Sequence, residues 1–328
     1  MKKLTALLLT LAMAISMTAC SSSASAPSEA EPEAEVVKIG ILQQLEHGSL
    51  DSARQGFIDA LADGGYVDGE NLEIDYQNAQ GDPSNLSTMS ERFVNNESDM
   101  VLAIATGAAQ SIASKTTEIP VLFTAVTDPV DAGLVNSNEN PGGNISGTND
   151  MNPIEAQIDL ITEICPDTQT IGIVYCSGED NSILQASIAK SHIESKGLQW
   201  VEGTVTNSND VQQVTQSIVE KCDAIYIPTD NAYASAMAVV AGVVMESKTP
   251  VVAGAIDMVR DGGLMTLGLN YYNLGYQTGE MALRILDEGA DISTMPVESL
   301  VKYDYYINAE MAQALGLEIP AEYAEYVK

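Results

Sequence analysis

Residues 100–126 read MVLAIATGAAQSIASKTTEIPVLFTAV, and this stretch decides the fold. It begins with a short apolar run, MVLAIA (100–105), which is typical of a strand buried on both faces. The segment QSIASKTTE (110–118) then has helical spacing, and IPVLFTAV (119–126) is a second apolar run. A strand, a helix and a strand in close succession predict a βαβ crossover between parallel strands.

The same alternation is found before and after this stretch. Towards the N-terminus, the pattern predicts strands and helices in turn: strand 36–43, helix 49–66, strand 71–79 and helix 82–96. Gly64 and Gly65 should stop the first of these helices, and Asp82 should be the N-cap of the second. After NISGTND (144–150) the pattern restarts, with helices at 154–165, 181–197, 211–222, 235–248 and 271–289 and strands at 170–176, 198–205, 223–230, 250–254 and 263–268.

Two such runs predict two doubly wound parallel-sheet lobes with a ligand cleft between them. In this class of fold, ligands bind at the carboxyl ends of the strands. The loops that should form the site are therefore 43–49, 104–109, 125–131, 148–152, 176–181, 228–233, 254–259 and 270–273.

The N-terminus has the features of an exported, lipid-anchored chain. Residues 1–19 combine two lysines with a short apolar run, which predicts a signal peptide. Met17–Cys20 resembles a bacterial lipobox, which predicts a lipid on Cys20; an ordinary secretory signal is the alternative. Residues 21–35 contain only Ser, Ala, Pro and Glu, so we expect 20–35 to be a lipidated cysteine and a disordered tether.

Charge and cysteine content exclude several functions. The net charge is −32, from 14 basic and 46 acidic residues, and such a surface repels nucleic acid. Cys165, Cys176 and Cys222 form no CxxC pair, and two histidines do not suffice for a plausible zinc set. We expect these cysteines to be small buried side chains; a disulfide between two of them is the alternative.

No catalytic motif is found in the sequence. GxSxG, HExxH, the Walker loop and a strand-coupled GxGxxG are all missing. Asp128 and Asp230 could imitate the carboxylate pair of a hydrolase, but the sequence shows no environment that would raise the pKa of either. We therefore predict that the chain is not an enzyme, and we predict no cofactor and no metal.

The loop at 104–109 joins a buried strand to a helix through small residues, Thr106, Gly107 and Ala108. The first turn of a helix has unpaired N–H groups and a partial positive charge. Small side chains allow an anion to approach, and Thr106 would add a hydroxyl at the N-cap position. These residues are candidates for binding a carboxylate or phosphate; tight packing of helix against sheet is the alternative.

Other polar side chains follow strand ends. Asp128 and Asp230 each follow a threonine and either cap the next helix or project into the cleft, where a carboxylate would neutralise an ammonium. We favour Asp230 for the ammonium, with Asn231 beside it. Gln44, Glu46 and His47 interrupt the pattern after the first strand and could contact a ligand or lie in a solvated loop.

Six stretches resemble bacterial ABC-transporter substrate-binding proteins of the tryptophan/tyrosine type, which have the type I periplasmic-binding fold. They match in order and spacing, although family members usually have proline at the position of Gly48. The stretches are KIGILQQLEHGSLDSARQGF (38–57), IPVLFTAVTDPVDAGLV (119–135), NISGTND (144–150), YIPTDNA (226–232), GLNYYNLGYQTGEMA (268–282) and YDYYIN (303–308).

The resemblance implies three crossover segments and discontinuous lobes, one formed by 36–146 plus 271–294 and the other by 147–270 plus 295–328. It also implies that Thr106 and the amides of Gly107 and Ala108 bind the carboxylate of an amino acid. Asp230 and Asn231 would bind its ammonium. The rest of the cleft would be lined by Thr127, Asp128, Asp150 and Asp257, with the ring of Tyr272.

The function implied by the resemblance is solute capture for import. An aromatic or other apolar amino acid would be bound by closure of the lobes and delivered to ABC permease subunits, at the outer face of the cytoplasmic membrane. A ligand-sensing receptor domain of a membrane signalling protein is the alternative, because it would need the same cleft.

Overall fold

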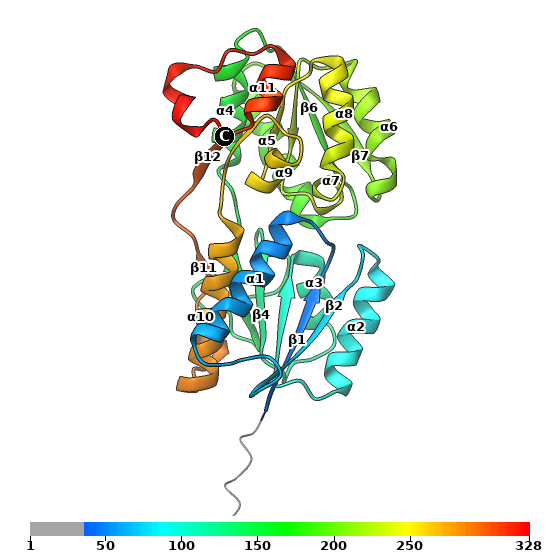
Figure 1. The fold of residues 1–328 in the computed structure, drawn as a ribbon. Coiled ribbons are helices and arrows are strands. Elements are labelled where there is room, and N and C mark those ends of the chain that lie inside the picture. The colour runs from blue at the N-terminus through cyan, green and yellow to red at the C-terminus, as the bar shows by residue number, and fades with distance from the viewer. Residues whose placement is uncertain (1–35) are drawn as a thin grey trace, which may run out of the picture. The chain divides into compact units, whose positions relative to one another are not determined.

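Two six-stranded sheets organise the chain in the computed structural model, which describes residues 36–328 (Figure 1). The expected signal peptide at 1–19 and the lipidated Cys20 with its tether at 20–35 lie outside the described residues. Along residues 36–328, no helix has the length and apolarity that a membrane span requires.

The first sheet has the strand order β11-β5-β4-β3-β1-β2, and all its pairs are parallel. Its continuous apolar runs became buried strands, as the sequence predicted; every residue of β3 and β4 is buried. The bounds are β1 Val37–Gln43, β2 Leu72–Asn78, β3 Met100–Ile104, β4 Val121–Val126, β5 Ile145–Asn149 and β11 Glu298–Ser299.

The second sheet repeats this order as β12-β10-β9-β8-β6-β7. It departs from the predicted parallel sheet at one edge, because β12 runs antiparallel to β10. The bounds are β6 Thr170–Cys176, β7 Gln199–Val205, β8 Ala224–Ile227, β9 Val251–Ala253, β10 Met265–Gly268 and β12 Asp304–Ile307.

Helices cover both faces of each sheet (Figure 1). On the first sheet α1 and α10 lie on one face and α2 and α3 on the other. The bounds are α1 Gly48–Asp63, α2 Pro83–Asn95, α3 Thr106–Ala113, α4 Ile154–Ile164, α5 Asp180–Ser195, α6 Val211–Val219, α7 Asn231–Ala234, α8 Met237–Ser247, α9 Ile256–Arg260, α10 Tyr271–Glu288, α11 Ala309–Leu315, and the 3₁₀ turns η1 Ser208–Asp210, η2 Ile292–Thr294 and η3 Ala321–Tyr326.

Two expected local features are confirmed. Asp82 is the N-cap of α2, and its carboxylate accepts from the amides of Ser84 and Asn85. The helix α1 ends at Asp63, directly before the predicted Gly64–Gly65 stop, and Gly65 has a φ of +92° that favours glycine.

The sheet pairing places two lobe boundaries later than the sequence did. Strand β5 pairs with β4 as far as Asn149, past the expected boundary at 146/147. Likewise β11 pairs with β5 at 298–299, past the expected boundary at 294/295. At both crossovers the chain therefore stays in the first sheet three to five residues longer than predicted. The division of the chain into two folding units remains a prediction.

Helices α1 and α10 pack backbone to backbone through glycines. A Cβ added to Gly275 of α10 would lie 1.8 Å from the Ala53 carbonyl oxygen of α1, and one added to Gly56 of α1 would lie 2.1 Å from the Tyr272 carbonyl oxygen. The exposed edge of this contact is closed by phenol–carboxylate bonds, such as Tyr276 to Asp63 at 2.9 Å. Because α10 follows β10 of the second sheet, this contact attaches a crossover segment firmly to the first lobe.

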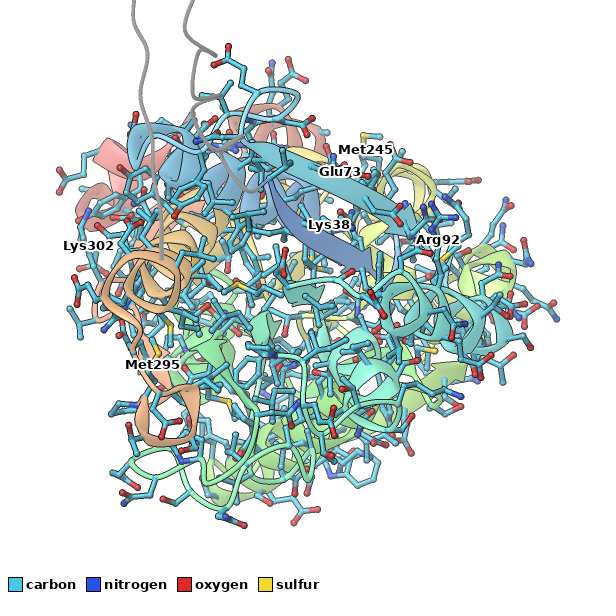
Figure 2. The ribbon with its side chains drawn as sticks, turned by 90° about the horizontal axis from the view of Figure 1, so that it is seen from below. Lys38, Glu73, Arg92, Met245, Met295 and Lys302 are labelled. Atoms are coloured by element: carbon cyan, nitrogen blue, oxygen red, sulfur yellow. The ribbon has the colours of Figure 1, made fainter. Side chains whose placement is uncertain are left out.

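The three cysteines are free thiols, so the disulfide alternative is not realised. Cys176 is buried, while Cys165 and Cys222 are partly buried, close to the expected role of small apolar side chains. At the end of the first lobe Lys38 of β1 lies opposite Glu73 of β2 in the sheet (Figure 2). Arg92 pairs with Asp75 at 2.6 Å, so basic and acidic side chains are interspersed there.

Candidate functional site

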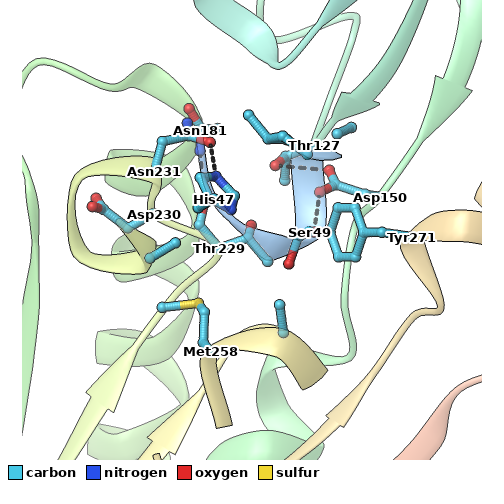
Figure 3. Close-up of a pocket in the computed structure, with 14 residues that line it drawn as sticks. His47, Ser49, Thr127, Asp150, Asn181, Thr229, Asp230, Asn231, Met258 and Tyr271 are labelled. Carbon is cyan, nitrogen blue, oxygen red and sulfur yellow. Dashed lines mark hydrogen bonds between the residues drawn. The ribbon is translucent and has the colours of Figure 1, made fainter. Parts of the chain in front are cut away.

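A pocket lies between the two lobes at the carboxyl ends of their strands, where the doubly wound fold predicts it (Figure 3). We call it the slot. It encloses about 320 Å³ of atom-free space, part of it at the mouth. Its lining consists of His47, Ser49, Leu50, Ala125, Thr127, Asp150, Asn181, Thr229, Asp230, Asn231, Ala234, Ala255, Met258 and Tyr271.

Asp150 is the acid that faces the slot. It follows β5 at the start of a crossover, and it accepts hydrogen bonds from the Tyr271 hydroxyl at 2.5 Å and the Thr127 hydroxyl at 3.2 Å (Figure 3). Burial raises the pKa of Asp150, and these two bonds lower it part of the way back. A cation in the slot would favour the ionised form.

Asp230 lines the slot, but its carboxylate points away from its centre (Figure 3). One oxygen accepts from the Tyr233 amide at 2.8 Å and caps α7, and the other accepts from the Cys176 amide at 2.6 Å. This bonding favours the helix-capping alternative over the predicted ammonium contact. Among the described residues, neither lysine nor arginine lines the slot.

His47 and Asn231 meet across the cleft. The Nε2 atom of His47 lies 3.1 Å from Oδ1 of Asn231 (Figure 3), and desolvation by the surrounding protein lowers the pKa of His47. Asn231 in turn donates through Nδ2 to Glu179 at 2.6 Å. Burial, and then the charge of Asp230, raises the pKa of Glu179 to about 8.

A wider outer pocket adjoins the slot. It encloses about 1190 Å³ of atom-free space, part of it open to solvent, and Gln44, Gly107 and Glu179 are among its lining residues. Ala232 also lines it, whereas its neighbour Asn231 lines the slot. The side chains of Asn231 and Glu179 therefore lie between the two pockets.

The N-terminus of α1 also faces the slot, through Ser49 and Leu50. The first amides of a helix have no acceptor within it, and their end of the helix is partly positive. Within the described chain, the N-cap residue His47 makes no side-chain bond to these amides. The side chain of His47 therefore leaves these amides free to pair with another acceptor.

The predicted carboxylate loop at 104–109 is arranged differently. The N-cap of α3 is Ala105, with a φ of +81°, and Thr106 is the first helical residue, so the prediction of Thr106 as the N-cap is wrong. The Gly107 amide already donates to Gln44 Oε1 at 2.9 Å. Thr106 and Ala108 are buried, and Thr106, Gly107 and Ala108 all lie outside the slot lining.

Four of the predicted ligand-binding residues line the slot: Thr127, Asp150, Asp230 and Asn231. Of the others, Glu46 is exposed, and Asp128 caps the turn that follows it by accepting from the Val130 and Asp131 amides. Asp257 lies just outside the slot, where it accepts from the Ser49 hydroxyl at 3.2 Å and pairs with Arg260.

The structure places Tyr271 in the slot, in place of its neighbour Tyr272, which the sequence analysis expected there. Tyr271 lines the slot, whereas Tyr272 lies on the exposed side of α10 and donates to Asp59 of α1 at 2.9 Å. Successive helical residues point about 100° apart, so only one of them can face the cleft. The rotation of α10 about its own axis decides which tyrosine faces the cleft. The glycine contact with α1 fixes that rotation.

Of the polar residues in the loop after the first strand, His47 lines the slot. Sequence reasoning missed Ser49, Asn181, Thr229 and the apolar lining of the slot. Most of these residues fall within the strand-end loops that the fold pointed to. The backbone gives a further signal that no sequence pattern shows: Ala125, at the irregularity in β4, has a φ of +57°. Such strained residues are often found at functional sites.

Comparison with known proteins agrees with this geometry. The sequence profile of a family described as ABC transporter substrate binding protein matches residues 38–327. The chain belongs to this family. Its members are binding proteins rather than enzymes, and the two lobes have the type I periplasmic-binding fold that the sequence predicted.

Two relatives carry the most information. A tyrosine-binding protein of Clostridioides difficile (strain R20291) is 40% identical over 291 residues, which cover 88% of this chain and 84% of the relative. The structure of an ABC domain from Streptococcus pneumonia in complex with L-Trp is 38% identical, with a TM-score of 0.86, and the match covers 90% of this chain and 100% of the other.

A third relative was solved in an open form. It is the ligand-free, open structure of a substrate-binding protein with adhesive properties from Clostridium difficile. Its identity is higher, 42%, but its TM-score is only 0.68, over 89% of this chain and 98% of the other. The chain therefore superimposes better on the L-Trp complex than on the open structure.

Proposed function

We propose that this chain captures an aromatic amino acid in the slot by closure of its lobes and delivers it to the permease of an ABC importer. The proposal rests chiefly on the lining of the slot, which has an acid at one side and a helix N-terminus at another. A zwitterion needs both kinds of partner.

The ammonium of the ligand is assigned to Asp150 rather than Asp230. Asp150 turns its carboxylate into the slot, whereas both oxygens of Asp230 already bind backbone amides. The carboxylate of the ligand is assigned to the amides at the start of α1. The ring would lie among the small and apolar residues Ala125, Ala234, Ala255, Met258 and Tyr271.

Closure is supported by contacts between the lobes around the slot. Besides His47 to Asn231, Ser49 bonds to Asp257 and Gln110 bonds to Asp180 at 3.1 Å. The better superposition on an L-Trp complex than on an open structure supports a closed arrangement here. A ligand can stabilise this form only by binding it better than the open form.

Outside the slot, the proposal includes the export signal and lipid anchor expected at residues 1–35. The protein would then work at the outer face of the cytoplasmic membrane, tethered through Cys20. Mass spectrometry of the purified membrane form would test this: we expect an N-terminal Cys20 that carries lipid, and an unmodified chain that begins elsewhere would contradict it.

Thermal unfolding with added amino acids tests the binding function. L-Tyr or L-Trp at about a hundred times its dissociation constant should add about 2.7 kcal/mol to the free energy of unfolding. L-Arg, whose cationic side chain finds no acid in the apolar lining, should give a much smaller shift. No shift with any aromatic amino acid would contradict the proposed ligand class.

A further inference from the structure

Three side chains form a hydrogen-bonded chain from the slot to the outer pocket. His47 of the first lobe contacts Asn231 Oδ1 of the second at 3.1 Å (Figure 3), and Asn231 Nδ2 donates to Glu179 Oε2 at 2.6 Å. Glu179 also accepts from the backbone amides of Asn231 and Ala232, at 3.1 and 3.3 Å, which hold its carboxyl group in place.

The orientation of the Asn231 amide decides where the proton of His47 lies. An ionised Glu179 only accepts hydrogen bonds, so Asn231 must present its NH₂ to Glu179 and its oxygen to His47. The Nε2 atom of His47 then has to carry the proton, which leaves Nδ1 as an acceptor. The direction of the amide thus fixes the histidine tautomer.

Protonation of Glu179 reverses the direction of each hydrogen bond between these three side chains. Its hydroxyl can donate to the Asn231 oxygen, and the turned amide offers its NH₂ to Nε2 of His47. The single proton of a neutral imidazole then lies on Nδ1. Because His47 lines the slot, the state of Nδ1 determines which hydrogen bond its ring offers there.

We propose that Glu179 is a positioning residue that sets, through Asn231, which nitrogen of His47 carries the proton. The slot consequently offers its ligand a hydrogen-bond acceptor at His47 when Glu179 is ionised and a donor when Glu179 is neutral. Glu179 itself acts from the outer pocket. It therefore influences recognition in the slot without being one of its lining residues.

The residues around these three side chains allow the exchange of His47 tautomers near neutral pH. Glu179 faces Asp230 at the start of α7 and Cys176 at the end of β6; burial and the charge of Asp230 raise its pKa to about 8. His47 faces Asp51 of α1, and Asp257 and Asp261 at α9, all of which favour its charged form. Desolvation outweighs them and lowers the pKa of His47, so its ring stays neutral while Glu179 titrates.

Nitrogen NMR of labelled histidine tests the proposal directly, because the chain has only two histidines. His192, which contacts Asp159 at 2.8 Å far from the slot, is an internal control. In the wild-type protein, free and with L-Tyr or L-Trp, we expect His47 to carry its proton on Nε2 at pH 9 and increasingly on Nδ1 towards pH 7. His192 should show no such exchange of tautomers.

Glu179→Gln mimics the neutral acid, since its NH₂ can donate to the Asn231 oxygen. We expect Nδ1 to be protonated in this variant at both pH values, whereas Glu194→Gln, which alters an exposed partner of Trp200, should behave as wild type. A His47 tautomer that changes neither with pH nor with Glu179→Gln, with or without amino acid, overturns the proposal. If Glu179→Gln fails to fold, the pH dependence of the His47 tautomer in the wild-type protein still tests the proposal.

Ligand affinity gives a second measurement, which rests on the proposed function. The dissociation constant for L-Tyr or L-Trp should change about tenfold between pH 7 and pH 9, as for one hydrogen bond gained or lost, and Glu179→Gln should lose this change and keep only the pH dependence that comes from Asp150. Thermal shift shows separately whether these amino acids bind. A tautomer switch without binding would therefore reject the ligand class alone, and binding without a switch would reject the role of Glu179 alone.

Discussion

Replacing Gly275 with alanine is expected to lower the free energy of unfolding by about 3 kcal/mol or more, at the upper end of what overpacking costs. The new Cβ would lie 1.8 Å from the Ala53 carbonyl oxygen and 2.5 Å from its carbon. Both are backbone atoms of α1, so no side chain can turn aside to make room. The two helices would have to move apart along their contact.

The consequence should extend beyond stability, because α10 begins with Tyr271 of the slot and follows a crossover segment. Urea unfolding measures the loss. Gly242→Ala is the matched control: it lies on α8, where an added Cβ meets nothing within 4 Å, and it should raise the free energy of unfolding by about 0.5–1 kcal/mol. Equal stability of the two variants would show that the helix contact is not tight.

The fold was predictable because its signals are local and repeated. Continuous apolar runs such as 121–126 can only be buried on both faces, and their alternation with amphipathic helices leaves few topologies besides a doubly wound sheet. What escaped prediction is where each strand stops pairing. The segment NISGTND was expected to cross between lobes from residue 147, yet it pairs as far as Asn149, because pairing depends on a neighbouring strand distant in sequence.

The site was predictable at the level of loops but not of side chains. The strand-end rule located the loops that contain His47, Ala125, Thr229 and Tyr271. It could not tell that the Gly107 amide is taken by Gln44, or that Asp230 turns back to cap α7. Both facts depend on the direction of one side chain, and a polar residue at a strand end can turn to a backbone amide as readily as to a ligand.

Replacing Asp150 with asparagine should weaken binding of L-Tyr or L-Trp about a hundredfold, or about 2.7 kcal/mol, because a charged partner is removed from a desolvated site. Asparagine has nearly the same shape; its Oδ1 can accept from one of the two hydroxyls of Tyr271 and Thr127, and its NH₂ can donate to the oxygen of the other, so the slot should keep its form. Calorimetric titration measures the dissociation constant, and thermal unfolding checks that the variant is folded.

The pH dependence separates this charge effect from a packing effect. Burial raises the pKa of Asp150 in the free protein, and a bound ammonium would lower it, so ligand affinity should fall as pH drops through the raised pKa. Asp150→Asn should lose this dependence. Asp230→Asn should lower stability instead, since it weakens bonds to the Cys176 and Tyr233 amides, and should change affinity less than threefold. A hundredfold loss in Asp230→Asn, with Asp150→Asn close to wild type, would return the ammonium to Asp230 and contradict the arrangement proposed here.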